Sequence, residues 1–336
     1  MISMIRNKYL TLIGVGLLFT AVSCTDGYEP EPVELVSIDF VFSKTDSLGT
    51  NAVKFMNNIY ATLQNGHNRV GSDYLDAASD DAISINVSDP DVYKLAMGRY
   101  TASTRVESDM RWKEYYSGIR KANILINHID VVPFMLTYKN AKGETKPLNV
   151  TMKAEARFLR AYFYYKLVEA YGPVPIVPEM AYDVDASAES MSLERETYEN
   201  CINYICENFE KAYEYLPSSR TSTLVNLPTS GAALALMGRV RLIEASPWYN
   251  GNEFYADWKR SDGTNFMPQV KDESKWGTAA LLAKRLIKGS EAGSFKYKLH
   301  TVERKLDTKP LPENVPDENY PNGAGGIDAL RSYAFM

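Results

Sequence analysis

Aromatic side chains with polar neighbours occur in two stretches of this sequence that lack helical periodicity. The first stretch holds Tyr74 with Arg69, Asp73 and Asp76, and the second holds Trp248, Tyr249 and Asn250, followed by Trp258. An aromatic ring can stack on the apolar side of a pyranose, while carboxylate, amide and guanidinium groups form hydrogen bonds with the sugar hydroxyls. These residues are therefore our candidates for binding a sugar without catalysis.

Two acidic pairs, Asp80 with Asp81 and Asp89 with Asp91, raise the question of glycoside hydrolysis. That chemistry needs two carboxyl groups that face each other at about 5 to 9 Å. Residues this close in sequence rarely face each other, so solvated loop acids are the better interpretation. The motifs GxSxG, GxGxxG and GxxxxGK followed by Ser or Thr are also absent, and we expect no catalytic activity.

Cysteine and histidine show no spacing typical of metal ligands. Cys201 and Cys206 lie five positions apart in a segment predicted to be helical, so their side chains point in different directions. His67, His128 and His300 are scattered along the chain. We expect two buried free thiols, and neither a metal nor another cofactor.

The composition is that of an ordinary globular protein. The 336 residues are 45% hydrophobic and 24% charged, and the net charge is −5. This length suits about two domains or one large helical array. The negative charge offers no basic surface to phosphate groups, so a nucleic-acid partner is not expected.

The N-terminus reads as an export signal rather than as part of the fold. Arg6 and Lys8 precede an apolar run over 10–20, and Ala21 to Cys24 form a small-residue cleavage site that ends in cysteine. The pattern resembles a bacterial lipobox in which Ala21 replaces the usual leucine. A plain signal peptide or a membrane-spanning helix is the alternative, although a span needs about 20 apolar residues. We expect a signal peptide over 1–23 and lipid attachment at Cys24.

The residues behind Cys24 are rich in proline and acid. The stretch 25–32 cannot pack and should form an extended tether. We expect residues 24–50 as a whole to be a lipidated tether and a lead-in to the folded body. Acidic residues at this place also resemble the surface-export signal of Bacteroidetes lipoproteins. We therefore expect a lipid-anchored protein of the outer membrane that faces the outside of the cell.

The segment 151–178 predicts one helix that is apolar on two sides and ends at Gly172-Pro173. One stripe consists of Ala154, Phe158, Ala161, Tyr165 and Val168, and the other of Ala156, Leu159, Phe163, Leu167 and Ala170. A surface helix has only one stripe to bury. Two stripes therefore indicate a middle position in a stack of helices.

Helical periodicity recurs along the chain, and strand alternation hardly appears. Further helices are predicted from Ala52 to Leu63, Trp112 to Ile129, Tyr198 to Leu216, Gly231 to Ala245 and Trp276 to Lys288, the last capped by Gly289. Gly238, within the helix predicted from Gly231 to Ala245, predicts that a neighbouring helix crosses closely there. We expect an all-α fold of tetratricopeptide-like stacked helical hairpins, an α–α superhelix, with long functional loops over 66–110, 133–150 and 249–274.

Four blocks of the sequence resemble the RagB/SusD family of Bacteroidetes. They are residues 112–129, 154–177, 229–251 and 312–334, and they occur in the family's order behind a lipoprotein signal. The resemblance implies a SusD-like helical domain over 51–290. Residues 291–336 would then be the start of a loop-rich C-terminal region, incomplete here, because members of the family usually run substantially longer.

The resemblance also implies a function. Its members are anchored by lipid to the outer membrane, sit as a lid on a SusC-like TonB-dependent transporter, and capture glycans or other nutrients without catalysis. It places the loop before Trp112 on the ligand face, although the apolar stripe that Trp112 opens favours a core role.

Two other functions stay open. A tetratricopeptide-like stack can serve as a protein–protein scaffold, because such arrays mostly present a concave face to peptides. A surface glycosidase is the third possibility, and no positioned acid pair supports it.

Overall fold

The chain divides into two compact units, residues 1–41 and 42–336. The computed structural model describes residues 37–64, 75–83, 90–101, 103–104, 110–180 and 186–298. Within the first unit these include only the short helix α2 (Ile38–Val41). The predicted signal peptide, the lipid attachment at Cys24 and the predicted C-terminal region beyond 298 lie outside the described residues.

Helix α7 (Leu148–Tyr171) is the central element of the second unit. Nearly all of the two apolar stripes predicted for it are buried; Phe158 is half-buried and Ala170 is exposed. The helix ends at Gly172, whose φ of +68° lies in the region that glycine adopts without steric cost. The predicted middle position is confirmed, since α7 packs against α6 on one side and α8 on the other.

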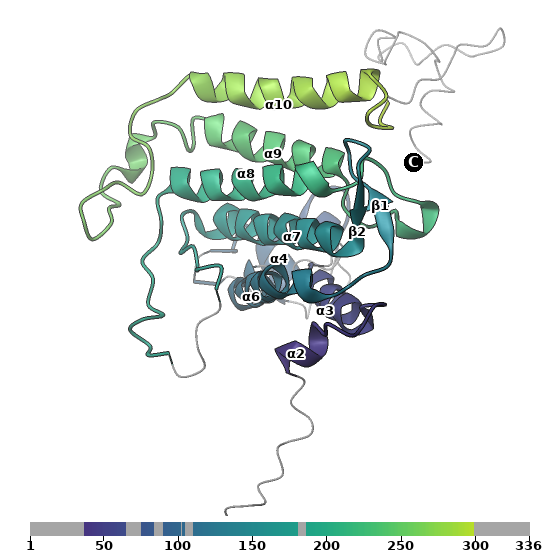
Figure 1. Ribbon diagram of the computed structural model, residues 1–336. Coiled ribbons are helices and arrows are strands. Elements are labelled where there is room, and N and C mark those ends of the chain that lie inside the picture. Colours follow the sequence, from purple (N-terminus) through teal and green to yellow (C-terminus); the bar gives the residue numbers. More distant parts are fainter. Residues whose placement is uncertain are drawn as a thin grey trace, which may run out of the picture. The chain divides into compact units, whose positions relative to one another are not determined.

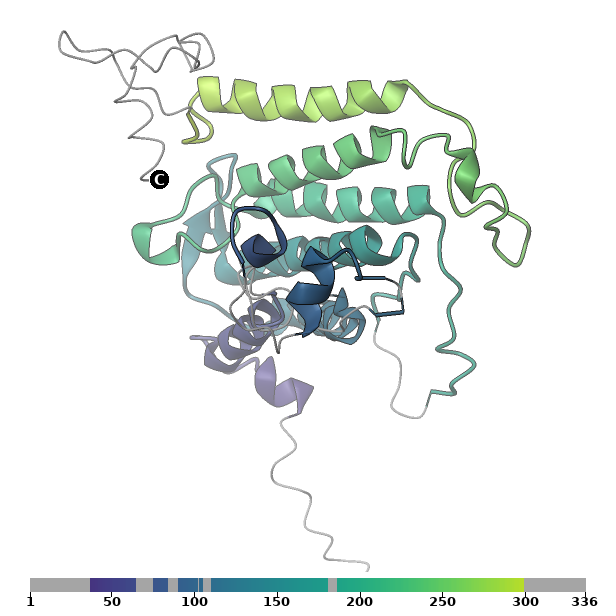
Figure 2. The same ribbon diagram turned by 180° about the vertical axis from the view of Figure 1, so that it is seen from behind.

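Long helices pack one on the next in chain order. They are α6 (Trp112–His128), α7, α8 (Tyr198–Tyr215), α9 (Ser230–Ala245) and α10 (Ser274–Glu291). Figure 1 shows these layers from α6 to α10, and Figure 2 shows the same order from behind. Helix α3 (Thr50–Tyr60) packs on α6 and α7. The stacked helical hairpins expected from the sequence are thus confirmed.

Helix α8 carries the most regular apolar stripe. The residues of this stripe are buried, and they are Tyr198, Ile202, Ile205, Phe209, Ala212 and Leu216. Thr197 caps its first turn, where its hydroxyl accepts a hydrogen bond from the Asn200 amide at 3.2 Å. Cys201 and Cys206 are free and buried, as predicted. Burial raises the pKa of the Cys201 thiol to about 11 and that of Cys206 to about 12.

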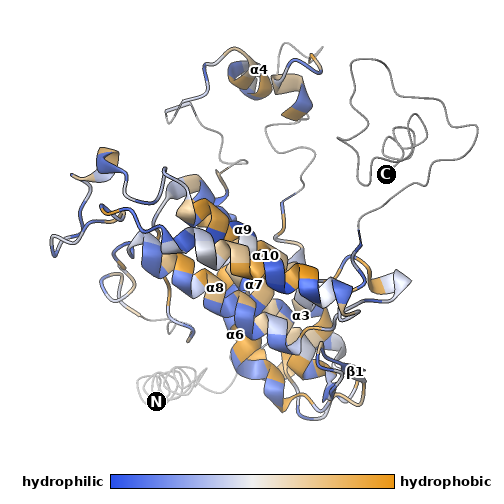
Figure 3. Cartoon of the chain, turned by 90° about the horizontal axis from the view of Figure 1, so that it is seen from above, coloured by the Kyte–Doolittle hydropathy of each residue, from blue (hydrophilic) through white to orange (hydrophobic). Residues whose placement is uncertain are grey.

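Helices α9 and α10 pack closely at Gly238. A Cβ atom there would lie 3.7 Å from the Leu282 Cβ, which confirms the predicted crossing. Helix α10 continues past Gly289 to Glu291, so the predicted cap at Gly289 is wrong. That glycine instead makes room for the Phe295 ring. Figure 3 looks down on these two helices and shows hydrophobic residues along both.

Short elements occupy the connections. The helix η2 (Ile129–Val131) is followed by β1 (Thr137–Lys139), which pairs antiparallel with β2 (Thr145–Pro147), so the predicted 133–150 loop is partly a β-hairpin. The helices η3 (Ser222–Leu224) and η4 (Glu253–Tyr255) lie in later connections. Within the described part of 66–110, η1 (Leu75–Ala78) contacts α4 (Pro90–Ala96).

Arg160 is a fully buried charge in α7 that joins three neighbouring segments. Its guanidinium donates to Asn208 of α8, to Asn123 of α6 at 2.7 Å and to Glu179 beyond α7 at 2.6 Å. The plane also lies 5.6 Å from the Tyr204 ring centroid. Because buried charges need partners, this network holds α6, α7 and α8 in one register.

An ion pair with both side chains buried joins Glu155 of α7 to Arg220 in the α8–α9 connection at 2.6 Å. The Tyr60 hydroxyl of α3 donates to the same carboxylate at 2.8 Å, and Arg220 also donates to the Pro228 carbonyl. Burial outweighs these partners and raises the pKa of Glu155 above its ordinary value.

Candidate glycan-binding surface

The described ends of three connections between helices meet at one end of the helix stack. We call this end the tip surface; it comprises the end of α3, the start of α6, residues 172–180 and 186–197 of the α7–α8 connection, and the α9–α10 connection 246–273. Arg111 donates to the Thr62 carbonyl at 3.0 Å and so joins the start of α6 to the end of α3. The Trp112 ring lies 4.8 Å from that of Tyr171. Trp258 would contact a Cβ atom at Gly172, which brings the third connection beside the second.

The connection 246–273 carries the exposed aromatic residues of the tip surface. Trp248 and Phe254 are 56% and 82% exposed. Both rings meet Tyr255 edge to face, with centroids 6.1 and 5.2 Å away. Tyr255 in turn lies 6.1 Å from Trp258, whose ring packs on Phe266 at 4.9 Å. Two exposed rings thus rest on a packed aromatic base.

Hydrogen bonds and one glycine fix the backbone of this connection. The Asn250 amide donates to the Asp272 carbonyl at 2.9 Å, and its oxygen accepts from the Asp272 amide at 2.9 Å, so the two ends of the connection are tied together. Gly251 has φ +80°, and a Cβ there would clash with the Lys271 backbone. The Asn252 side chain accepts from the Phe254 amide and begins η4. The exposed rings are therefore held by an ordered loop.

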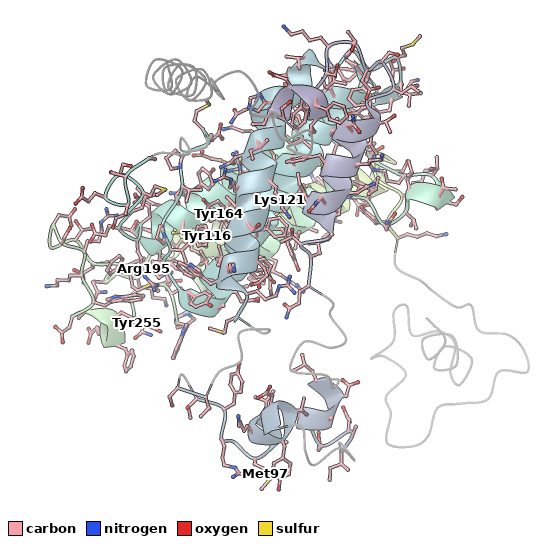
Figure 4. All side chains as sticks on the ribbon, turned by 90° about the horizontal axis from the view of Figure 1, so that it is seen from below. Met97, Tyr116, Lys121, Tyr164, Arg195 and Tyr255 are labelled. Atoms are coloured by element: carbon pink, nitrogen blue, oxygen red, sulfur yellow. The ribbon has the colours of Figure 1, made fainter. Side chains whose placement is uncertain are left out.

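A second aromatic group lies at the junction of α6 and α7. Trp112 lies 4.9 Å from Tyr116, whose hydroxyl donates to the Pro175 carbonyl at 2.7 Å. Arg195 donates to the carbonyls of Tyr171 and Pro173 and lies 5.9 Å from the Trp112 ring centroid. Figure 4, seen from below, shows Tyr116, Arg195 and Tyr255 toward the same end of the helices.

Arg260 connects the two loops of the tip surface electrostatically. Its guanidinium lies 2.9 Å from Glu196 and 3.5 Å from Glu194. A hydrogen bond from Asn200, with a further contribution from Arg260, lowers the pKa of Glu196. The carboxylate of Glu194 also accepts from the Ser261 amide at 2.6 Å. These acids are engaged in holding the loops together.

More than half of the chain matches the sequence model of one protein family. The model of a SusD-like family, described as starch-binding and associating with the outer membrane, matches residues 44–242. The chain belongs to this SusD-like family. A SusD-like protein of Formosa agariphila is 28% identical over 187 residues, which cover 54% of this chain and 32% of that protein. One from Bacteroides ovatus is 25% identical over 179 residues, covering 49% and 30%.

Solved structures agree on the fold of this SusD-like chain. The structure of BT4246 superposes with a TM-score of 0.55 at 19% identity, over 78% of this chain and 42% of that one. At this identity the likeness concerns the fold alone. The chain spans about a third of the length of the curated relatives it matches.

The predicted site residues of this SusD-like chain fall into four groups. Arg69, Asp73 and Tyr74 lie outside the described residues, and Asp76 is an exposed residue of η1. Trp248 and Trp258 belong to the aromatic group around Tyr255 on the tip surface. Tyr249 stacks on Tyr198 of α8 at 4.7 Å, and Asn250 is only 2% exposed, so the structure places both in the support of the loop.

Sequence reasoning did not single out Phe254 and Tyr255, which complete the aromatic group of the 246–273 connection. Part of a signal was present, because Asn252 is of a type favoured at the start of a helical turn, but nothing in the sequence marks the exposure of the two rings that follow Glu253. Arg195 was also missed, and nothing in its sequence surroundings marks it.

The described residues contain neither a cluster of three potential metal ligands nor a helix that is long and apolar enough to cross a membrane. Asp80 and Asp81 are both exposed, and Asp91 lies 3.5 Å from Lys94.

Proposed function

We propose that this SusD-like protein binds a glycan at the cell surface and delivers it to a SusC-like TonB-dependent transporter, without catalysis. The observation that carries the proposal is the exposed pair Trp248 and Phe254, held on an aromatic base at the tip surface of a chain from a starch-binding family. The two rings support a binding site because they share contact with Tyr255 and so form one patch, whereas exposed apolar residues scattered singly are ordinary.

The physical mechanism is stacking combined with hydrogen bonding. The faces of Trp248 and Phe254 are open to the apolar side of a pyranose ring, and the ordered loop reduces the entropy lost on binding. Exposed Glu253 and Asp257 in the same connection are available to sugar hydroxyls. Because Arg260 engages Glu194 and Glu196, those two acids support loop structure rather than a hydrolytic pair.

Calorimetric titration with neutral glycans such as laminarin and starch oligosaccharides tests this proposal. We expect Trp248→Ala and Phe254→Ala each to weaken binding about fivefold to tenfold, since stacking of one ring is worth about 1 to 1.5 kcal/mol. Trp276→Ala is the matched control, because Trp276 is a similarly exposed tryptophan on α10. Equal binding by all three variants would contradict a site at the tip surface.

Anchoring and partnership have their own experiments. We propose that Cys24 carries the lipid, that the stretch behind it is the tether, and that the body faces the outside of the cell. Cys24→Ala should shift the protein from the membrane fraction to the soluble fraction, and labelled palmitate should attach only to the native chain. Co-purification with a TonB-dependent barrel tests the transporter. Native protein found only in soluble fractions would reject the anchor.

One observation favours a second candidate, a peptide-binding scaffold. A groove of about 360 Å³ lies between α3, α7 and α9, and it is lined mainly by Tyr60, Leu63, Phe158, Tyr162, Leu227 and Leu236. Peptide binding in this groove should persist in Trp248→Ala and be lost in Tyr162→Ala. Glycan binding at the tip surface should instead be weakened in Trp248→Ala and persist in Tyr162→Ala.

A further inference from the structure

A second recess lies on the side of α6 that faces α3. This basic pocket has a volume of about 270 Å³ and is lined chiefly by Thr62, Arg111, Lys113, Glu114, Ser117 and Lys121. Helical spacing puts Lys113, Ser117 and Lys121 on one face of α6, away from the Trp112 and Tyr116 rings. Figure 4 shows Lys121 between α6 and α3, and its ammonium donates to Asn58 of α3 at 2.7 Å.

The charge of the basic pocket is opposite to that of the whole protein. Arg111, Lys113 and Lys121 contribute three cations, against the one carboxylate of Glu114. The chain as a whole has a net charge of −5. A local excess of cations within an acidic protein attracts an anion and excludes a cation.

Two polar atoms of residues that line the basic pocket are buried without hydrogen-bond partners in the described part of the chain. They are Nε of Arg111, a donor, and Oε2 of Glu114, an acceptor. Buried polar groups nearly always have partners, because an unpaired one keeps the full cost of its desolvation. The pair therefore calls for a ligand that both accepts and donates hydrogen bonds.

The backbone conformation of Arg111 is a further sign that the basic pocket is a functional site. Among the described residues, Arg111 is the one non-glycine residue with a positive φ, at +49°. The guanidinium is held there by the Thr62 carbonyl at 3.0 Å and by the Tyr115 ring, whose centroid lies 5.6 Å away. Glycine would adopt this conformation without steric cost. An arginine kept in a conformation that favours glycine is typical of a functional position.

We propose that the basic pocket binds the anionic group of an acidic glycan, a sugar that carries a carboxylate or a sulfate ester. The anion accepts hydrogen bonds from Arg111, Lys113 and Lys121, and a neighbouring sugar hydroxyl donates to Glu114. Free phosphate fits less well, because at neutral pH it is largely a dianion and is repelled by the Glu114 carboxylate more strongly than a singly charged carboxylate or sulfate ester. This inference rests on the proposed glycan-binding function and specifies the class of sugar.

The test compares three oligosaccharides of similar length on the full chain: oligogalacturonate for the carboxylate, a chondroitin sulfate fragment for the sulfate, and a neutral maltooligosaccharide. We expect at least one acidic probe to bind about tenfold or more tighter than the neutral one. The advantage should shrink as salt is raised, because exposed charges are screened. The stronger of the two acidic probes identifies the anionic group.

Arg111→Gly is the decisive variant, because it removes the guanidinium while suiting the positive φ. It relieves the positive φ but loses the hydrogen bond to Thr62, so the melting temperature should change little while most of the preference for the acidic probe is lost. Lys121→Gln should reduce the preference partially, and Lys288→Gln on α10 serves as the matched control. Equal affinity for acidic and neutral probes, or an unchanged preference in Arg111→Gly, overturns the basic pocket but leaves neutral glycan binding standing. If no probe binds, both proposals fall.

Discussion

Arg160 shows how a single residue can set the register of several helices. Replacing it by methionine keeps most of the side-chain volume but leaves the oxygens of Asn123 and Asn208 without their donor. Removing one partner of a buried charged network costs about 3 kcal/mol of unfolding free energy. Urea unfolding of Arg160→Met, followed by circular dichroism, measures this loss.

Arg285→Met is the control for that experiment. Arg285 forms an ion pair with Glu210 at 2.9 Å, but both side chains are about two-fifths exposed. A surface pair of this kind contributes less than about 1 kcal/mol. If the two variants lost the same stability, the buried network would not have the role described.

Glu155 makes stability depend on pH. Its folded-state pKa is raised above the ordinary value of 4.5, so the folded protein holds this proton more tightly than the unfolded chain does. Its contribution to the free energy of unfolding is therefore greatest below pH 4.5 and declines as pH rises through the raised pKa. Glu155→Gln lacks this titration.

Unfolding measurements from about pH 4 to about pH 7 should then show native protein losing stability relative to Glu155→Gln. Glu144→Gln is the control, because the Glu144 carboxyl is exposed and hydrogen bonds from Lys146 and Asn140 lower its pKa. That difference should run in the opposite direction or be too small to detect. A rise in relative stability with pH at Glu155 would refute the assignment.

At the scale of the helix, two glycines test how tightly the elements pack. A Cβ at Gly118 of α6 would lie 2.7 Å from the Phe163 ring and 2.9 Å from Thr62. Gly118→Ala should therefore cost about 1 to 3 kcal/mol through overpacking. Gly277 of α10 has open space around its Cβ position, and Gly277→Ala should stabilise the protein by up to about 1 kcal/mol.

Thermal unfolding of the two variants measures both effects in the same assay. The pair shares one substitution and one kind of secondary structure and differs in what the new methyl group meets. Destabilisation by Gly277→Ala would show that α10 has a neighbour there.

Helices could be predicted from this sequence where one long stripe decides the matter. In α7 and α8 the three-then-four spacing runs through the whole helix, and both were predicted within about three residues of their observed ends. The β1–β2 hairpin was missed, because three-residue strands of mostly polar residues carry no alternation signal. Gly289 misled, since tight packing against Phe295 also selects glycine.

The candidate site could be predicted only in part, for a different physical reason. Trp248 and Trp258 were found because they are large and stand outside the helical pattern. The basic pocket was not, because its residues come from two segments 49 positions apart at the Arg111–Thr62 contact. Nothing local in sequence marks a distant pairing of that kind.

At the scale of the whole array, stability should be highest in the middle. Helix α7 is covered on both sides, whereas α4 contacts mainly the short helix η1 among the described elements. Hydrogen exchange followed by mass spectrometry should show α7 amides exchanging about 100-fold or more slowly than those of α4. Equal protection of the amides in both helices would contradict a stack in which stability is highest at the central helix.

The gathering of hairpin connections at one end has an evolutionary consequence. Since the helices bury their stripes against one another, a connection such as 246–273 can be lengthened, shortened or exchanged while the packed layers keep their contacts. Descendants of one ancestral scaffold can therefore acquire new ligand preferences by replacing these connections, without having to evolve a new core.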